Sequence, residues 1–203
     1  MPEIIGVQND GGPVCHMQPG VGGLSMGTIF LPPANMATAN TGGNGITLDD
    51  TAPPTMAISG TAGRSQFVVM QFAKDTASSI VYIDVILPND FSARANLNLF
   101  IYWFCADNTA GKTSYWTTTW RVVHGDGTAI IDTAGTAGAV ASQAVPTTVN
   151  RLTKSRVKCP SAVLAALKPG DHLLIQVYSD IGGANIPGAV MEVPYMLMTY
   201  ERA

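Results

Sequence analysis

The sequence predicts an all-β protein, an antiparallel β-sandwich of the jelly-roll type with an extended N-terminal arm. From residue 64 on, apolar runs with strand-like alternation recur between clusters of turn-forming residues, and only one short segment has a helical pattern. Many strands, Gly/Pro-rich turns and almost no helix are typical of a sandwich or barrel. A jelly roll protects its sheet edges by pairing two sheets, which makes it the fold we expect first.

The predicted arm covers residues 1–62, and the sandwich domain covers residues 63–203. Gly and Pro interrupt the arm every few residues, so only short strands fit there, at 27–31 and 55–58. A Gly/Pro-rich segment with few core-forming residues becomes ordered when it docks on another surface. We expect that surface to be the arm's own domain or a neighbouring subunit.

The sandwich domain contains a series of apolar segments bounded by turn signals. They predict strands at 66–73, 79–87, 96–105, 114–124, 154–158, 172–179 and 189–201, and weaker ones at 128–132 and 147–152. Pro194 predicts a kink or an edge position in the last strand. Residues 133–144 are rich in Ala, Gly and Thr and predict a surface loop, whereas 161–167 fits a short helix.

The strand at 96–105 is apolar on both faces. One face carries Leu97, Leu99, Ile101 and Trp103, and the other carries Phe100, Tyr102 and Phe104. A strand of this kind is normally covered on both sides. We therefore expect it inside a sheet, with the core on one face and a loop, a second sheet or a neighbouring subunit on the other.

Charge is scarce in this chain. Hydrophobic residues make up 46% and charged residues 12% of the sequence, and the net charge is −3. This composition favours a surface that is buried against partners, although a neutral surface rich in Thr, Ser and Asn is the alternative. The densest basic stretch, 151–158, is typical of a solvated strand or loop, so no nucleic-acid partner is expected.

The three cysteines, Cys15, Cys105 and Cys159, are spaced neither as a disulfide framework nor as a zinc site. Cys15 precedes His16, but no second pair at ligand spacing accompanies them, so we expect no metal and no cofactor. Cys105 fits a small buried hydrophobic position. The N-terminus lacks a leader pattern and no run spans a bilayer, which predicts folding in a reducing cytoplasm.

The order of features from residue 80 to 201 resembles a family of small virion proteins of tailed bacteriophages. The features are the Ile-Leu-Pro-Asn-Asp-Phe step at 86–91, the aromatic strand at 97–104, the Trp-rich strand at 116–124, the Pro-Gly-Asp-His strand at 169–180 and the Met-Thr-Tyr-Glu ending at 198–201. The resemblance implies a jelly roll on a phage head or tail, often trimeric, acting as a decoration, minor capsid or fibre-base component. It supplies no catalytic residues and does not extend to residues 1–60.

The candidate binding residues are aromatic or methionine side chains. Tyr102 and Trp103 in one strand, and Tyr115, Trp116 and Trp120 in another, are expected in neighbouring strands. They fit a sugar-stacking platform, a subunit interface or the core, with the core favoured for Trp103. Met196 and Met198 fit a core or an interface. The interface candidates are therefore Tyr102, Trp116, Trp120, Met196 and Met198.

Three functions follow from these observations. The first is a structural virion subunit, a homotrimer that assembles through its N-terminal arm and its subunit interfaces and contacts other virion proteins such as the major capsid protein. The second is a carbohydrate- or receptor-binding module of a phage tail or fibre, which requires exposed Trp116 and Trp120 rings. The third is a hydrolase, which requires at least two of His124, Asp126, Asp171 and His172 to converge. No Gly-x-Ser-x-Gly motif is present, and we expect no enzyme.

Overall fold

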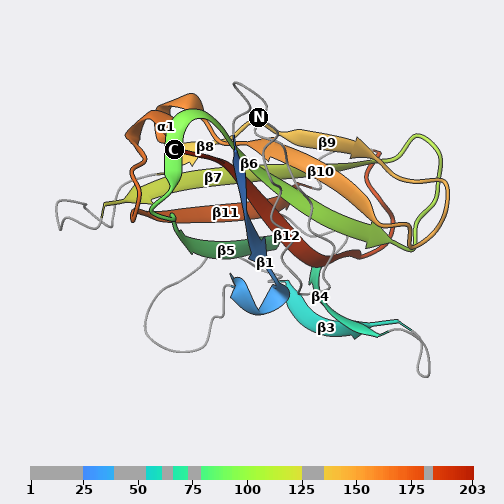
Figure 1. The fold of residues 1–203 in the computed structure, drawn as a ribbon. Coiled ribbons are helices and arrows are strands. Elements are labelled where there is room, and N and C mark those ends of the chain that lie inside the picture. Colours follow the sequence, from blue (N-terminus) through green and yellow to red (C-terminus); the bar gives the residue numbers. More distant parts are fainter. Residues whose placement is uncertain (1–24, 39–53, 61–65, 73–78, 125–134, 181–184) are drawn as a thin grey trace, which may run out of the picture.

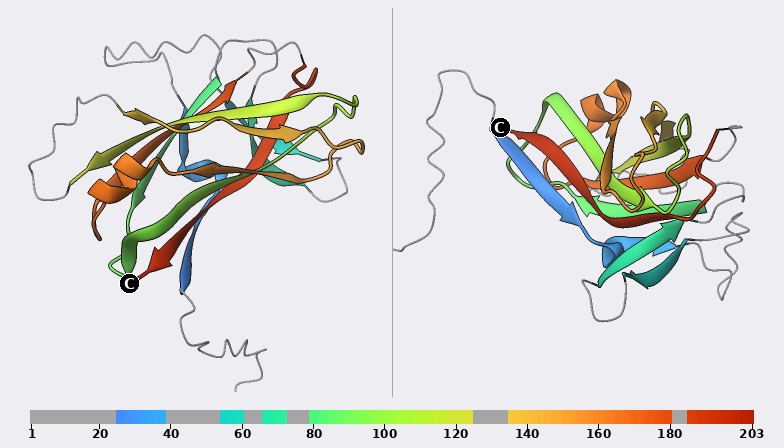
Figure 2. Two further views of the ribbon diagram at one scale, coloured as in Figure 1. Left: turned by 90° about the horizontal axis from the view of Figure 1, so that it is seen from above. Right: turned by 90° about the vertical axis from the view of Figure 1, so that its right-hand side faces the viewer.

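The computed structural model describes residues 25–38, 54–60, 66–72, 79–124, 135–180 and 185–203. These residues form two antiparallel sheets that pack face to face, with one short α-helix and one 3-10 turn among them (Figures 1 and 2). The all-β sandwich predicted from the sequence is therefore confirmed, and its two-sheet layout is that of a jelly-roll-like fold.

Sheet A has the strand order β10-β6-β12-β4-β3, and β1 also pairs with β12. Along one side of β12, β1 pairs with the C-terminal half and β4 with the N-terminal end. Along the other side lies β6, which is thus an interior strand between β10 and β12. The strands are β1 (Met26–Leu31), β3 (Thr55–Ser59), β4 (Phe67–Phe72), β6 (Phe91–Cys105), β10 (Thr153–Lys158) and β12 (Met191–Arg202).

Sheet B has the order β2-β5-β11-β7-β8, and β9 pairs with β7 beside β8. Its strands are β2 (Met36–Thr38), β5 (Ser79–Ile86), β7 (Thr113–Val123), β8 (Thr136–Ala137), β9 (Ala141–Ala144) and β11 (His172–Asp180). The 3-10 turn η1 (Pro33–Asn35) carries the chain from β1 in sheet A to β2 in sheet B. The helix α1 (Ser161–Ala166) lies between β10 and β11 and buries Val163 and Leu164.

The core lies between the two sheets and follows the strand alternation. Inward-facing residues are buried in sheet A at Leu97, Leu99, Ile101 and Trp103, and in sheet B at Val81, Ile83, Trp116, Trp120, Leu173, Ile175 and Val177. Two of the buried indole N–H groups have partners, because Trp103 Nε1 donates to Ser155 Oγ at 2.9 Å and Trp120 Nε1 donates to Thr118 Oγ1 at 2.7 Å. Both indole rings are therefore buried while their N–H groups keep a hydrogen-bond acceptor in place of water.

Two parts of the predicted arm belong to the sandwich. The strands β1 and β3, expected at 27–31 and 55–58, are confirmed, and they pair with β12 and β4 in sheet A. The strand β2, also within the predicted arm, pairs with β5 in sheet B. These parts of the arm therefore dock on the chain's own sandwich, and the boundary at residue 62 stays a prediction. Residues 1–24 and 39–53 lie outside the described residues.

Three further expectations need correction. The predicted loop 133–144 contains β8 and β9, which pair with β7, and the predicted strand 147–152 has no strand pairing. The aromatic strands β6 and β7 are not neighbours, because β6 is in sheet A and β7 is in sheet B. The expected strand at 128–132 lies outside the described residues.

The last strand has the irregularity that Pro194 predicts. The register between β12 and β6 shifts between Glu192 and Tyr195, on either side of this proline. Proline has no N–H to donate to the ladder, so a bulge is where it fits in an interior strand. The shift turns the side chain of Tyr195 onto the outer face of sheet A, next to Tyr102.

Candidate functional site

Four of the five candidate binding residues lie in the core. Trp116, Trp120, Met196 and Met198 are each 0% exposed. The sequence left them open between core and interface, and the structure places them in the core. The alternation of β7 and β12 points these side chains toward the opposite sheet, where Trp116 packs edge-on against Phe72 with ring centroids 5.1 Å apart.

Tyr102, the fifth candidate, lies on the outer face of sheet A. Its ring stacks on Tyr195 with the centroids 4.6 Å apart, and Tyr195 in turn contacts Phe30 at 5.5 Å. Burial and the neighbouring Tyr102 raise the pKa of Tyr195. Phe30 and Tyr195 are not among the candidates named from the sequence. They alternate with the buried Leu31 and Met196, which is the signal that could have placed them on the outer face.

A groove of about 720 Å³ opens beside this aromatic row. Its walls include Phe67 of β4, Phe104 of β6 and Tyr195 of β12, together with Leu152. Phe67 and Phe104 meet edge to face at 5.7 Å. The groove is thus lined largely by rings and aliphatic side chains and joins the outer face of sheet A to the β3–β4 hairpin.

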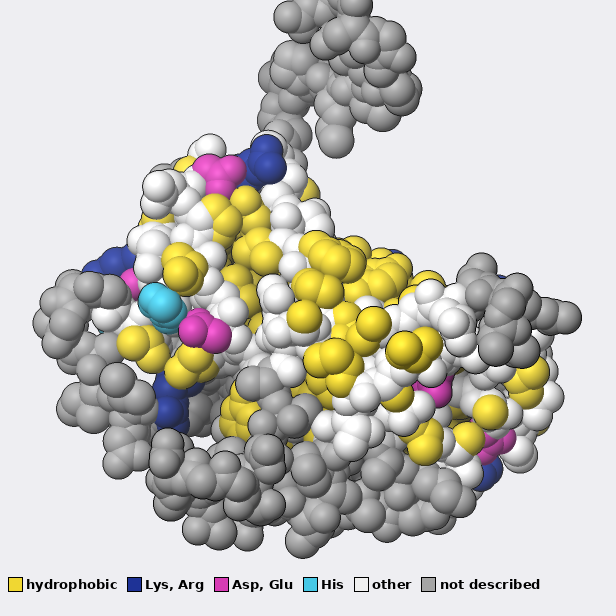
Figure 3. Space-filling model, turned by 90° about the horizontal axis from the view of Figure 1, so that it is seen from below, with side chains coloured by type: hydrophobic (Ala, Val, Ile, Leu, Met, Phe, Trp, Pro, Cys, Tyr) yellow, Lys and Arg dark blue, Asp and Glu magenta, His cyan; other side chains and the backbone are white. Residues whose placement is uncertain are grey.

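Large hydrophobic side chains are exposed along the same side of sheet A. They belong to β1, β3 and β4 and are Met26, Phe30, Met56, Ile58, Phe67 and Val68, which we call the apolar patch. The patch extends around the β3 edge, because Phe30 and Phe67 are on the outer face, whereas Met56, Ile58 and Val68 are on the face that carries Met70 and Phe72. Figure 3 shows hydrophobic side chains gathered on the face where η1, β3 and β4 lie. Contiguous exposed apolar surface of this kind usually marks a binding or assembly site.

The basic residues of 151–158 lie at the opposite edge of sheet A. Lys154, Arg156 and Lys158 alternate along β10 and are exposed, as expected for a solvated strand. Lys154 Nζ lies 5.0 Å from the centre of the Phe100 ring, and Arg156 Nε donates to Asn98 Oδ1 at 2.9 Å. Sheet A therefore has a cationic edge at β10 and an apolar edge at β3.

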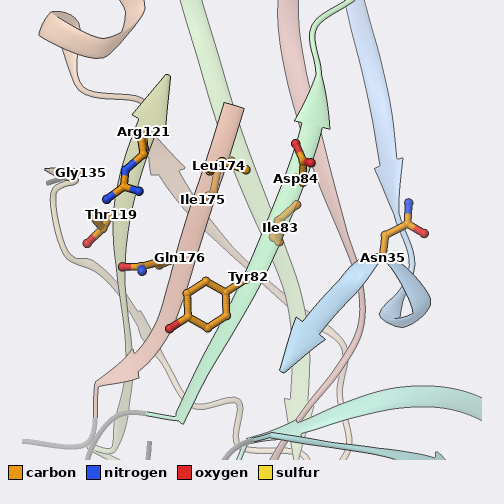
Figure 4. Close-up of a pocket in the computed structure, with 10 residues that line it drawn as sticks. All are labelled: Asn35, Tyr82, Ile83, Asp84, Thr119, Arg121, Gly135, Leu174, Ile175 and Gln176. Carbon is orange, nitrogen blue, oxygen red and sulfur yellow. The ribbon is translucent and has the colours of Figure 1, made fainter. Parts of the chain in front are cut away.

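The outer face of sheet B holds a second, smaller groove of about 380 Å³ (Figure 4). Its lining combines apolar area from Ile83, Leu174 and Ile175 with polar groups of Tyr82 and Asp84 on β5, Gln176 on β11, and Thr119 and Arg121 on β7. The strands β5, β11 and β7 lie side by side and hold these residues on one face. This groove differs from the groove beside sheet A in having a carboxylate and a guanidinium among its lining side chains.

Two of the four residues named for the hydrolase hypothesis, His124 and Asp171, lie in contact, whereas His172 pairs with Asp84, which is outside that set. His124 Nδ1 lies 2.9 Å from Asp171 Oδ2, and His172 Nδ1 lies 3.2 Å from Asp84 Oδ1. Asp171 is buried and its Oδ2 also accepts the Lys168 N–H at 2.8 Å, so this carboxylate holds the turn before β11. Asp126 lies outside the described residues. The His124–Asp171 contact thus meets the condition on convergence, but neither residue lines one of the two grooves described above, and the expectation of no enzyme stays a prediction.

The two described cysteines are free thiols, and both are buried. Burial raises the pKa of the Cys105 thiol, and it raises that of Cys159 to about 12, so neither has the thiolate character of a reactive cysteine. The described residues contain no cluster of three or more His, Cys, Asp or Glu suited to a metal ion. Within the same residues, no helix is long and apolar enough to cross a membrane.

Comparison with known proteins yields similarity of fold only. No family model matches the sequence, and no curated protein matches it. Among solved structures, the enzymatically active domain of bacteriophage CBA120 tailspike protein 4 has a TM-score of 0.38 and 14% identity, over 81% of this chain and 19% of that one. This chain thus spans about a fifth of the tailspike chain.

A second similar structure is CBM27-1 of Caldicellulosiruptor saccharolyticus in complex with mannohexaose. It has a TM-score of 0.40 and 12% identity, over 85% of this chain and 97% of the module. Scores and identities this low assign no function to the chain. Of the interpretations made from the sequence, the all-β sandwich fold is confirmed.

Proposed function

We propose that this chain is a structural subunit of a bacteriophage particle that assembles with copies of itself through sheet A. The phage assignment is supported by the sequence resemblance over residues 80–201. The assembly role is supported by the apolar patch, together with a charged fraction of only 12%. Decoration or minor capsid protein is the particle component that this family resemblance favours.

The apolar patch is the observation that carries the assembly role. Ile58 is 69% exposed, Met56 57% and Phe30 56%, although transfer of each of these side chains out of water is favourable. Full burial of such a side chain contributes about 1.5–3 kcal/mol. Methionine and aromatic residues are also the types enriched at protein interfaces. Covering the patch with another subunit would remove a large unfavourable contact with water.

The edge position of β3 adds a second argument. β3 is the last strand in the order of sheet A, and among the described residues it pairs only with β4. An edge strand that presents apolar side chains and unpaired backbone groups is a template for pairing with another chain. The cationic residues that would oppose self-association lie on β10, at the other edge of the sheet.

Carbohydrate binding through Trp116 and Trp120 is not part of this proposal. A stacking platform needs rings that a sugar can reach, and both indoles are fully buried between the sheets. Of the aromatic residues named from the sequence for a stacking platform, Tyr102 and Tyr115 are partly exposed, on sheet A and sheet B respectively. A sugar-binding function therefore has to use a different set of side chains.

The test is the solution mass of the full chain, measured by light scattering after size exclusion. We expect an oligomer, with a trimer favoured by the family resemblance, and a monomer for the double variant Phe30→Ser, Ile58→Ser. The matched control is Ile86→Ser, because Ile86 is 62% exposed but belongs to sheet B. Circular dichroism shows whether each variant keeps its β structure.

Two results would overturn the assembly role: a monomeric wild-type chain at micromolar concentration, or an equal loss of mass in the Ile86→Ser control. The particle assignment has a separate measurement. Mass spectrometry of purified phage particles from the source of this sequence should detect the chain at a stoichiometric level, and its absence from the particles would contradict the assignment.

A further inference from the structure

The groove on the outer face of sheet B is not used by the assembly proposal. It is about 380 Å³ in volume and is bordered by Asn35 of η1 on one side and Gly135 on the other. Side chains of three neighbouring strands form its floor (Figure 4). A cavity of this volume falls in the range that accommodates a small ligand.

The strand register arranges the floor in two rows. Gln176 lies opposite both Tyr82 and Thr119, which forms the first row across the three strands. Leu174 lies opposite both Asp84 and Arg121, which forms the second. Strands are about 4.8 Å apart and alternate residues about 7 Å apart, so the floor measures roughly 10 by 7 Å. A small oligosaccharide segment covers an area of that size.

The polar groups of the floor are held by neighbours outside it. Tyr178 Oη donates to Gln176 Oε1 at 2.5 Å, so the amide NH₂ group is the part of Gln176 that can donate to a ligand. His172 Nδ1 lies 3.2 Å from Asp84 Oδ1, which orients the carboxylate and leaves Oδ2 as an acceptor. Orientation by neighbouring hydrogen bonds lowers the entropy cost of binding a polar ligand.

The chemistry of the floor selects a class of ligand. Tyr82 and Leu174 offer apolar area, whereas Asp84, Gln176, Thr119 and Arg121 offer both donors and acceptors. One carboxylate and one guanidinium give the site no net charge, which disfavours both anions and cations. A sugar ring has an apolar face for stacking and hydroxyl groups that both donate and accept. We infer that this groove binds a neutral oligosaccharide.

The experiment uses the full-length chain on an array of neutral and acidic glycans, followed by calorimetry with the neutral glycan that gives the strongest signal. We expect binding to neutral glycans, weakened about tenfold or more by Gln176→Ala and by Tyr82→Ala. Tyr82→Phe should retain most of the affinity, because the stacking ring remains. Ile86→Ser, on the same sheet face but outside the groove lining, should bind as the wild type does.

Several outcomes would overturn the inference. They are the absence of binding to every neutral glycan, binding to acidic glycans only, and binding that persists in both alanine variants but is lost in Phe30→Ser. Light scattering on the same samples separates this result from the assembly proposal. Gln176→Ala should keep the wild-type mass, so loss of sugar binding and loss of assembly are distinguishable.

Discussion

The two outer faces of the sandwich differ in chemistry although they cover the same core. Sheet A presents stacked rings and aliphatic side chains, as in the Tyr102–Tyr195 pair and the exposed Phe30. Sheet B presents an amide, a carboxylate, a guanidinium and a hydroxyl around Tyr82. One β-sandwich can therefore have one outer face suited to permanent burial and another suited to reversible polar binding.

The physical reason lies in the cost of removing each face from water. Each Å² of apolar surface that is buried stabilises the complex by about 25 cal/mol. Burial of a polar group is unfavourable unless a partner replaces every hydrogen bond that the group made with water. The second copy of the chain that we propose would satisfy the first condition on sheet A. A hydroxyl-rich ligand satisfies the second on sheet B.

The largest expected effect on stability is the difference between a substitution in the core and one on the outer face of sheet A. Leu31 and Phe30 are neighbours on β1, but Leu31 is 1% exposed and Phe30 is 56% exposed. We expect Leu31→Ala to lower the free energy of unfolding by about 2–5 kcal/mol. Phe30→Ala should cost about 1 kcal/mol or less in the isolated subunit. Urea unfolding at low protein concentration measures both, and equal costs would show that the chain itself covers this face.

The next effect tests whether β1 is an integral strand of sheet A. Gly27 lies opposite Tyr200, and a Cβ at this position would overlap the Tyr200 ring. That ring is buried, and its hydroxyl donates to Asp90 Oδ1 at 3.0 Å, so it cannot move away without a cost. Gly27→Ala should therefore destabilise the fold by about 1–3 kcal/mol.

Thr28→Ala provides the control for this substitution, because Thr28 is the exposed neighbour on the same strand. It should change the stability by about 0.5 kcal/mol or less. Thermal unfolding compares the two variants, and hydrogen exchange reports on the β1 amides. A neutral Gly27→Ala variant would mean that β1 is loosely docked, as the predicted arm would be.

The smallest effect concerns the end of the sandwich where Asp107 lies between β6 and β7. Hydrogen bonds from the Thr109 side chain and from the Gly188 and Thr109 N–H groups hold the pKa of Asp107 well below its usual range. The two N–H groups lie 2.6 and 2.8 Å from the carboxylate, and Lys112 Nζ lies 3.2 Å away. A lowered pKa in the folded state means that the ionised form contributes stability at neutral pH.

That contribution is lost as the pH falls below about 4, where the unfolded carboxylate takes up a proton first. We expect Asp107→Asn to be less stable than the wild type at pH 7 and to lose less stability between about pH 4 and pH 2. Denaturant unfolding across this pH range measures the difference. Asn108→Ala should keep the wild-type pH dependence, and an unchanged profile for Asp107→Asn would refute the role of this carboxylate.

The sequence by itself determined where most strands lie and which of their residues share a face. The alternation of Leu97, Leu99, Ile101 and Trp103 predicts one buried face of β6, and the structure confirms it. The sequence also predicted a kink or an edge position at Pro194, where the structure has a register shift in an interior strand, and a short helix at 161–167, which the structure has at Ser161–Ala166. These features depend on side-chain period and on the loss of one N–H, which are local properties of the chain.

Only the tertiary structure decided which strands are neighbours and what each outer face becomes. Phe30 meets Tyr195 because β1 pairs with β12, and Tyr82 meets Gln176 because β5 pairs with β11. Both pairs join residues far apart in the chain. Pairing depends on the free energy of the whole assembled core, whereas alternation along one strand is the same whichever strand lies beside it. The burial of Trp116 and Trp120, which the sequence left open between core and surface, was settled for that reason.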